Sequence, residues 1–201
     1  MTSLPRVYPI IDRAAWIGRL APTGVRLLQL RIKEQPAAFI AAQIRAARAQ
    51  CRAAGIQLIV NDHWQPALEA GCDFVHLGQQ DLEAADLAAL RRAGVRLGVS
   101  THDDAEFERA MSVQPDYVAL GPIYPTTLKV MPWAPQGLAR IAEWKRRVGA
   151  VPLVAIGGIT LERLPAVLAA GADTAAVVSD IVAAADPAAR TRAWLDAAAA
   201  A

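Results

Sequence analysis

The sequence has little of several features that mark other classes of protein. Of its 201 residues only two are cysteines and 5% are aromatic. No apolar run approaches the roughly 18 residues that a membrane span needs. The formal net charge is only +2, with acidic and basic residues interspersed, so the chain lacks the basic patch of a nucleic-acid-binding protein. Its start, MTSLPRVYPIID, has no basic segment followed by a long apolar one, so no signal peptide is expected.

The two cysteines, Cys51 and Cys72, belong to no metal-binding or disulfide motif. We therefore expect reduced thiols packed on helices, and a cytoplasmic protein. Hydrophobic residues make up 54% of the chain, which is enough to bury a core. Length and composition together predict one domain over residues 1–201.

Short apolar segments alternate with longer alanine-rich segments along the chain. The apolar segments predict strands over residues 7–11, 25–31, 56–61, 73–78, 96–101, 116–121, 152–158 and 174–179. The segments between them have apolar residues at helical spacing, and they predict helices over residues 14–20, 36–54, 64–71, 82–93, 104–113, 136–148, 161–170 and 186–200. Several of these helices end at a glycine, as helices often do.

The predicted strands are continuously apolar, which is typical of a parallel sheet covered on both faces. Eight strand–helix units in 201 residues leave about 25 residues per unit, close to the lower limit for a (β/α)₈ TIM barrel. A doubly wound open sheet uses the same units and is the alternative. The α/β barrel is favoured because the sequence has no break, linker or second domain.

Polar residues gather where the predicted strands end, which in such barrels is where the active site forms. Arg31 and Lys33 follow the second strand, and the carboxylates Asp62 and Asp81 follow the third and fourth. This combination suits a diphosphate bound with Mg²⁺, because carboxylates hold the metal and cations neutralise the remaining phosphate charge. The polar residues at these strand ends are Gln29, Arg31, Lys33, Asn61, Asp62, His63, His76, Gln79, Asp81, Ser100, Thr101 and His102.

The connection over residues 121–137, GPIYPTTLKVMPWAPQG, is unusually long for a compact domain. It carries four prolines, the adjacent Thr126 and Thr127, the cation Lys129 and no acidic residue. Long connections are often functional, and prolines limit the conformational freedom that a loop loses on ordering. We expect this loop to bring its threonines and its lysine to phosphorylated ligands.

Small residues follow the last two predicted strands, in the segments GGI (157–159) and VVS (177–179). The loops after the seventh and eighth strands of a barrel commonly bind phosphate through backbone N–H groups. The sequence therefore predicts two anionic sites, a diphosphate site with metal near strands two to four and six, and a monophosphate site near the last two strands.

Each of these features also has a purely structural interpretation. Asp62 and Asp81 could cap the helices that follow them, and polar residues over 100–103 could cap the next helix. Arg31 and Lys33 could form a salt-bridged rim of the barrel. The histidines are expected to be structural rather than catalytic, and they are His63, His76 and His102.

Seven segments, in order from the second strand to the eighth, closely resemble those of the thiamine phosphate synthase family. They are QLRIK (29–33), VND (60–62), VHLGQQDL (75–82), GVSTH (98–102), GPIYPTTLK (121–129), VAIGGIT (154–160) and AVVSDI (176–181). The resemblance covers essentially the whole chain. It implies a transferase that joins hydroxymethylpyrimidine diphosphate to hydroxyethylthiazole phosphate, giving thiamine phosphate and pyrophosphate.

The resemblance also implies roles for individual residues. Asp62 and Asp81 would be the Mg²⁺ ligands, and the catalytic groups would be Lys33, Ser100 and Lys129. The pyrimidine diphosphate would bind to Gln29, Arg31, Lys33, Asn61, Ser100 and Lys129. The thiazole phosphate would bind to Thr126, Thr127, Gly157, Gly158, Val178 and Ser179. The expected partners are small phosphorylated molecules rather than nucleic acid or membrane, with a homodimer as a candidate assembly.

The loop departs from the family pattern at one position, where Pro-Thr-x-Thr-Lys is usual. Leu128 replaces the second threonine, so a hydroxyl contact to the thiazole phosphate is lost unless Thr127 supplies it. Trp133 could cover the pocket or pack on the barrel. The alternatives are a thiazole tautomerase, which would not need the carboxylates or the lysine, a phosphoribosyl isomerase-type barrel, and a non-catalytic barrel that binds thiamine intermediates.

Overall fold

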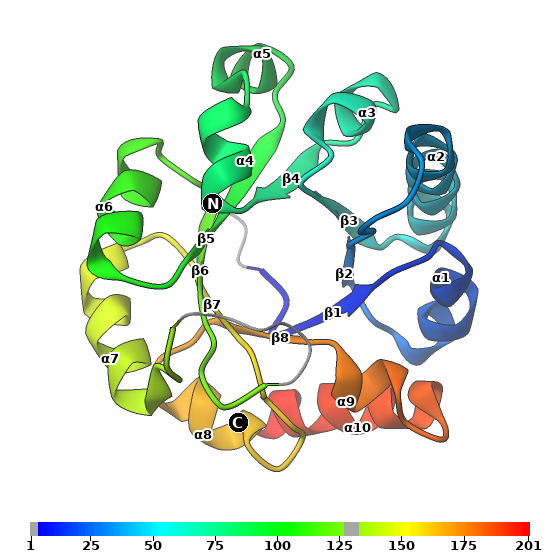
Figure 1. Cartoon of the computed structure of the whole chain (residues 1–201). Helices are drawn as coiled ribbons and strands as arrows, with labels where there is room; N and C mark the ends of the chain where they lie inside the picture. Colours follow the sequence, from blue (N-terminus) through cyan, green and yellow to red (C-terminus); the bar gives the residue numbers. More distant parts are fainter. Residues whose placement is uncertain (1–3, 127–132) are drawn as a thin grey trace.

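The computed structural model describes residues 4–126 and 133–201. Eight parallel strands close into a barrel in the order β1-β2-β3-β4-β5-β6-β7-β8, and β1 pairs with β8 to complete the ring. Figure 1 shows the helices as an outer ring around these strands. The prediction of a (β/α)₈ barrel is confirmed, and the doubly wound open sheet is excluded because such a sheet does not close.

The strands are short, and each is buried along almost all of its length. They are β1 (Val7–Ile11), β2 (Leu27–Leu30), β3 (Gln57–Asn61), β4 (Phe74–Leu77), β5 (Arg96–Thr101), β6 (Tyr117–Leu120), β7 (Leu153–Ile156) and β8 (Thr174–Val177). The predicted extension of the seventh strand to residue 158 is wrong, because Gly157 and Gly158 have φ of 97° and 64° and turn the chain out of the sheet.

The helices connect successive strands and cover the outside of the barrel. They are α1 (Ala15–Leu20), the 3-10 helix η1 (Ala21–Thr23), α2 (Ala37–Ala54), α3 (Trp64–Glu69), α4 (Gln79–Ala84), α5 (Leu87–Arg92), α6 (Asp104–Ser112), α7 (Gly137–Val148), α8 (Leu164–Ala169), α9 (Ser179–Val182) and α10 (Pro187–Ala200). None of the helices within residues 4–126 and 133–201 is both long enough and apolar enough to cross a membrane.

Two helical predictions are corrected by the structure. The single helix expected over residues 82–93 is divided into α4 and α5, because Ala85 is extended and the Asp86 side chain accepts a hydrogen bond from the N–H of Ala89 at 2.8 Å. An aspartate that caps one helix in this way ends continuity with the helix before it. The four-residue helix α9 was not predicted, since it is too short to show helical periodicity.

Side chains along each strand alternate between the barrel interior and the helix layer, as the twofold period of a strand requires. The interior holds an apolar and aromatic cluster that includes Tyr8, Ile59, Phe74, Tyr117 and Val154. A much larger apolar cluster fills the space between the strands and the surrounding helices. Burial on both faces explains why the strands are continuously apolar in the sequence.

Both cysteines are free thiols and both are buried. Cys51 lies on α2, but Cys72 lies in the turn before β4, so the expectation that both thiols sit on helices is wrong for Cys72. Burial raises the pKa of each thiol to about 11. Both thiols are therefore protonated at neutral pH, which is the state of an unreactive structural cysteine.

Candidate active site

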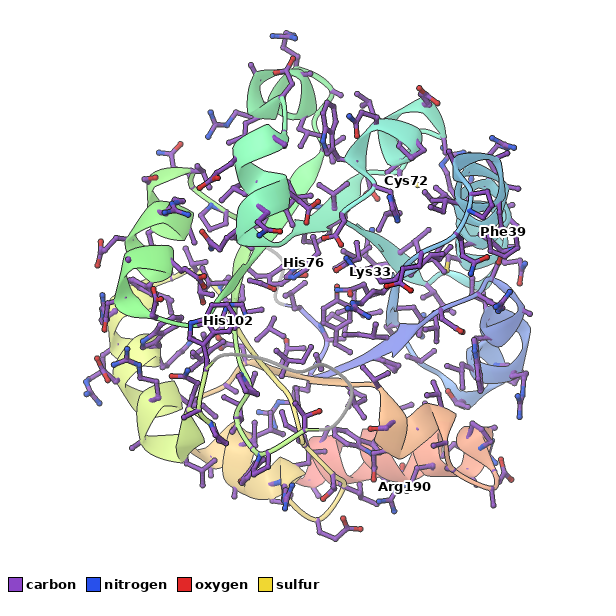
Figure 2. All side chains as sticks on the ribbon, in the orientation of Figure 1. Lys33, Phe39, Cys72, His76, His102 and Arg190 are labelled. Atoms are coloured by element: carbon purple, nitrogen blue, oxygen red, sulfur yellow. The ribbon has the colours of Figure 1, made fainter. Side chains whose placement is uncertain are left out.

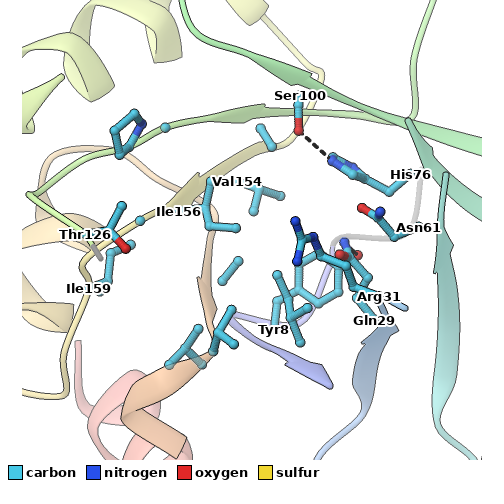
Figure 3. Close-up of a pocket in the computed structure, with 18 of the residues that line it drawn as sticks. Tyr8, Gln29, Arg31, Asn61, His76, Ser100, Thr126, Val154, Ile156 and Ile159 are labelled. Carbon is cyan, nitrogen blue, oxygen red and sulfur yellow. Dashed lines mark hydrogen bonds between the residues drawn. The ribbon is translucent and has the colours of Figure 1, made fainter. Parts of the chain in front are cut away.

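A cavity of about 260 Å³ lies at the carboxyl ends of the strands. Figure 3 shows Arg31 and Asn61 on one side of it and Thr126 and Ile159 on the other. Most of the residues predicted to bind substrates line this cavity: Gln29, Arg31, Asn61, Ser100, Thr126, Gly157, Gly158, Val178 and Ser179. The structure thus brings together residues from β2, β3, β5 and the loops after β6, β7 and β8.

Arg31 is the cation that projects into the cavity (Figure 3). Its guanidinium has no ion pair or hydrogen bond with any residue in the described part of the chain. A salt-bridged rim is therefore the wrong interpretation for Arg31. A guanidinium that faces a cavity without a counter-ion is suited to an anionic ligand, which it can bind through two parallel N–H groups.

A cluster of three charged side chains lies at the rim of the barrel opening. It consists of Lys33, Asp62 and Asp81. The Lys33 ammonium donates a hydrogen bond to the Asp62 carboxylate, and Figure 2 shows Lys33 inside the ring of helices, beside β2. Asp62 has a φ of 61°, and its N–H donates to the carbonyl of His76 at 2.9 Å. An unusual backbone conformation of this kind often marks a functional position.

The two carboxylates lie close enough for each to affect the ionisation of the other. Burial opposes ionisation of Asp62, but the hydrogen bond and charge of Lys33 lower the pKa of its carboxyl below the usual value. Burial and the neighbouring Asp62 charge raise the pKa of Asp81. A divalent cation at this position would neutralise both carboxylates and remove their mutual repulsion.

Capping does not account for these carboxylates. The N-cap residues of α3 and α4 are His63 and Gly78, so neither Asp62 nor Asp81 occupies the capping position. Within residues 4–126 and 133–201 no cluster of three or more metal-ligating side chains occurs. A pair of carboxylates nevertheless fits Mg²⁺, which usually takes one or two carboxylates and completes its shell with water and substrate phosphate.

A chain of buried hydrogen bonds crosses the barrel interior beneath the cavity. Gln29 Nε2 donates to Tyr8 Oη at 2.8 Å, and Tyr8 Oη lies 3.1 Å from Tyr117 Oη. Tyr117 Oη lies 2.7 Å from Nδ1 of His76, whose Nε2 lies 2.7 Å from Ser100 Oγ. We call these five side chains the polar chain. Burial lowers the pKa of His76 to about 4, so its imidazole is neutral at neutral pH.

The other side of the cavity combines aliphatic side chains with a turn that contains two glycines. A Cβ atom on Gly158 would lie 2.5 Å from the carbonyl oxygen of Pro125, and one on Gly157 would lie 2.7 Å from Pro122. The absence of these side chains lets the turn after β7 pack closely on the loop after β6. The contact is held by a hydrogen bond from the N–H of Tyr124 to the carbonyl of Gly157 at 3.0 Å.

Comparison with known proteins agrees with this geometry. A family model described as thiamine monophosphate synthase matches residues 7–181. The chain is 62% identical to a thiamine-phosphate synthase of Rhizobium etli over 188 residues, which cover 94% of this chain and 92% of the relative. It is 52% identical to one of Cronobacter sakazakii, over 90% of this chain and 86% of the relative.

The chain belongs to the thiamine monophosphate synthase family. Among solved structures it is similar to a thiamine phosphate pyrophosphorylase from Pyrococcus furiosus, with a TM-score of 0.85 and 25% identity over 98% of this chain and 96% of that one. A 3-hexulose-6-phosphate synthase has a TM-score of 0.69 at 19% identity, covering 96% of this chain and 99% of that one, and this likeness concerns the fold alone.

The structure does not describe every residue to which the family resemblance gives a role. Thr127, Leu128 and Lys129 lie outside the described residues. Trp133, the nearby aromatic residue, stacks on the ring of His102, with the ring centroids 3.9 Å apart. Because His102 lines the cavity, Trp133 packs at its edge.

Two of the histidines have the structural contacts that were expected of them. His63 Nε2 lies 3.0 Å from the carbonyl oxygen of Ile32, and His102 Nδ1 lies 2.7 Å from the Glu106 carboxylate. The capping interpretation of residues 100–103 holds for Asp103, which accepts from the N–H of Glu106 at 2.9 Å. Ser100 instead contacts His76, which leaves it at the cavity.

Tyr8 and Tyr117 both line the cavity, although neither was predicted to belong to the site. Both belong to apolar strand segments and were counted as core. Their positions along the strands could have indicated them. Tyr8 lies two residues before Ile10 on β1, and Tyr117 lies two residues before Ala119 on β6, so each faces the barrel interior with that residue.

Proposed function

We propose that this protein condenses hydroxymethylpyrimidine diphosphate with hydroxyethylthiazole phosphate, releasing pyrophosphate, as a Mg²⁺-dependent single-domain enzyme of the cytoplasm. The observation that carries the proposal is the charge pattern of one cavity and its rim. The Arg31 guanidinium, which has no partner in the described part of the chain, faces the cavity, and the interacting carboxylates Asp62 and Asp81 lie at the rim with Lys33. Family membership and the relatives' printed names support the same reaction.

The diphosphate end of the first substrate would bind on the β2–β5 side. Asp62 and Asp81 would hold Mg²⁺, which when bound supplies positive charge to the departing diphosphate. Arg31 and Lys33 would bind the diphosphate oxygens, together with Lys129 from the loop after β6.

The remaining contacts would come from uncharged side chains. Ser100 would donate a hydrogen bond to the diphosphate, while Gln29 and Asn61 would orient the pyrimidine.

The reaction we propose is a dissociative substitution. The bond between the pyrimidine methylene carbon and the diphosphate oxygen breaks, and its electron pair leaves with the diphosphate. The electron-rich aminopyrimidine stabilises the resulting cation by resonance. The lone pair of the thiazole nitrogen then forms the new carbon–nitrogen bond. No side-chain nucleophile or strong base is required, so cations placed to stabilise the leaving group suffice.

The thiazole phosphate would bind on the β6–β8 side. Thr126, Gly157 and Gly158 line the cavity there, together with Val178 and Ser179 at the start of α9, and Thr127 would join them. Anchoring the phosphate in this way would hold the thiazole nitrogen close to the reacting carbon, which lowers the entropic cost of the bimolecular step.

The test is pyrophosphate release by the purified protein with both substrates and Mg²⁺, in the parent and in Asp62→Asn and Asp81→Asn. We expect release that needs both substrates and the metal, and that falls about a hundredfold or more in each variant because leaving-group stabilisation is lost. Glu83→Gln is the matched control, since Glu83 lies on α4 beside Asp81 but its carboxylate is 65% exposed and pairs with Arg109.

Two results would contradict the proposal. Absence of pyrophosphate release from the parent, with thiazole phosphate still bound, would favour the non-catalytic barrel. Full activity in both carboxylate variants would remove Asp62 and Asp81 from the metal site. The tautomerase alternative is disfavoured because it does not need the carboxylate pair.

A further inference from the structure

The polar chain links side chains from five strands by four hydrogen bonds. Its members are Gln29 on β2, Tyr8 on β1, Tyr117 on β6, His76 on β4 and Ser100 on β5. Gln29, Tyr8, Tyr117 and His76 are buried. The two ends, the Gln29 amide and the Ser100 hydroxyl, line the cavity and have hydrogen-bonding capacity left for a ligand there.

The direction of the hydrogen bonds can be followed from one end to the other. The Gln29 amide nitrogen can only donate, so Tyr8 Oη accepts from it. Either hydroxyl could donate in the bond between Tyr8 and Tyr117. The buried Tyr8 hydrogen has no other acceptor in the described part of the chain, and an unsatisfied buried donor is unfavourable, so Tyr8 is assigned as the donor. Tyr117 then has its hydrogen free for Nδ1 of His76. A neutral imidazole that accepts at Nδ1 carries its hydrogen on Nε2, and that hydrogen points at Ser100 Oγ.

Ser100 Oγ is therefore an acceptor within the chain, and its own hydrogen is left for the cavity. We propose that Tyr8 and Tyr117 are positioning residues with separate roles: Tyr117 fixes the tautomer of His76, so that the cavity ligand meets a donor at Ser100, and Tyr8 orients the Gln29 amide, so that the ligand meets an acceptor at the Gln29 carbonyl. On the function proposed above, the Ser100 partner is an oxygen of the diphosphate and the Gln29 partner is an N–H of the pyrimidine.

The geometry around Tyr117 keeps its hydroxyl in this position. The Tyr117 ring stacks on the His76 ring, with centroids 5.5 Å apart and planes at 12°, and meets the Tyr8 ring edge-on. It fills the space over Gly98, where a Cβ atom would lie 2.1 Å from a ring carbon. Reversal of the bond between Tyr8 and Tyr117 would leave the buried Tyr8 hydrogen without an acceptor in the described part of the chain, which disfavours the opposite direction.

The direction can be measured without any substrate. The protein has only three histidines, so ¹⁵N-histidine labelling gives three imidazole spin systems, which His63→Gln and His102→Gln assign by elimination. Long-range ¹H–¹⁵N correlation at neutral pH distinguishes the two tautomers. We expect His76 to carry its hydrogen on Nε2. The Nδ1 tautomer in the parent would overturn the proposal.

Two phenylalanine variants test the roles of the tyrosines. Tyr117→Phe removes the donor to Nδ1, so the Nδ1 tautomer of His76 should become populated. Tyr8→Phe leaves that donor in place, so the His76 tautomer should stay unchanged while Gln29 loses its acceptor. Tyr124→Phe, which alters the third tyrosine of the chain, is the control for the spectrum. An unchanged His76 tautomer in Tyr117→Phe would overturn the proposal, and so would an equal change in Tyr8→Phe.

Activity gives a second, separate measurement. We expect Tyr117→Phe to lower kcat by about threefold to tenfold with little change in KM, because the Ser100 donor acts on the departing group. Tyr8→Phe should mainly raise KM for the pyrimidine substrate. A parent protein without activity would overturn the proposed function, whereas the tautomer measurement would still decide the direction of the polar chain.

Discussion

The two sides of the cavity are built by opposite means. On the β1–β6 side the surface is made of polar side chains, with the polar chain and Arg31 lining the cavity and Lys33, Asp62 and Asp81 at its rim. On the β6–β8 side aliphatic side chains are combined with bare backbone at Gly157 and Gly158. The first side offers groups of specified charge and hydrogen-bonding direction, and the second offers an apolar wall and a close approach of two loops.

This difference predicts how each side of the cavity responds to amino-acid substitution. A side-chain surface loses function when a functional group is removed, often with little loss of stability. A backbone surface is damaged when atoms are added, because the loops can no longer approach each other. The side-chain side also depends on a glycine, because Gly98 makes room for the Tyr117 ring.

The largest loss of stability is expected for Gly98→Ala. The added Cβ would lie 2.1 Å from a ring carbon of the buried Tyr117, so the ring must move and the polar chain must open. We expect the free energy of unfolding to fall by about 3 kcal/mol or more, measured by urea denaturation. Gly18→Ala is the control, because nothing lies within 4 Å of its Cβ position on α1. Equal stability of the two variants would contradict this account.

A smaller loss is expected for Gly158→Ala on the backbone side. The residue has a φ of 64°, and its Cβ would lie 2.5 Å from a carbonyl oxygen of the facing loop. We expect a destabilisation of about 1–3 kcal/mol, and KM for the thiazole phosphate should rise about tenfold. Gly24→Ala also has a positive φ, 89°, but an open Cβ position. It should lose some stability and leave KM unchanged, and a similar KM change there would mean that strain, not loop contact, is responsible.

The smallest effect on stability is expected for Arg31→Gln. Its guanidinium has no partner in the described part of the chain, so the free energy of unfolding should change by no more than about 0.5 kcal/mol. Affinity for the pyrimidine diphosphate should nevertheless fall about tenfold to a hundredfold, because a charge-assisted hydrogen bond is lost. Titration calorimetry would measure this. Arg26→Gln, an exposed change just before β2, is the control, and unchanged affinity in Arg31→Gln would place the diphosphate elsewhere.

Much of the molecule followed from local patterns along the chain. Alternating strand and helix segments predicted the closed barrel, since parallel strands joined by helices have few other ways to bury both faces. Residues directly after strands, such as Arg31 and Asn61, could be assigned to one cavity because strand ends share one face of a barrel. The division of the helix at Ala85 was missed, because a capping aspartate inside an alanine-rich segment leaves the apolar spacing unchanged.

The sequence by itself determined the barrel, the family and the group of polar residues around its opening. Only the tertiary structure decided that Asp62 and Asp81 influence each other's ionisation, that Arg31 faces the cavity with no partner in the described part of the chain, and that Tyr8 and Tyr117 complete a chain from Gln29 to Ser100. The physical reason is that the interacting residues lie far apart in the sequence. Tyr8 and Tyr117 are 109 residues apart, and their hydroxyls meet because closure of the barrel turns β1 and β6 toward the same interior.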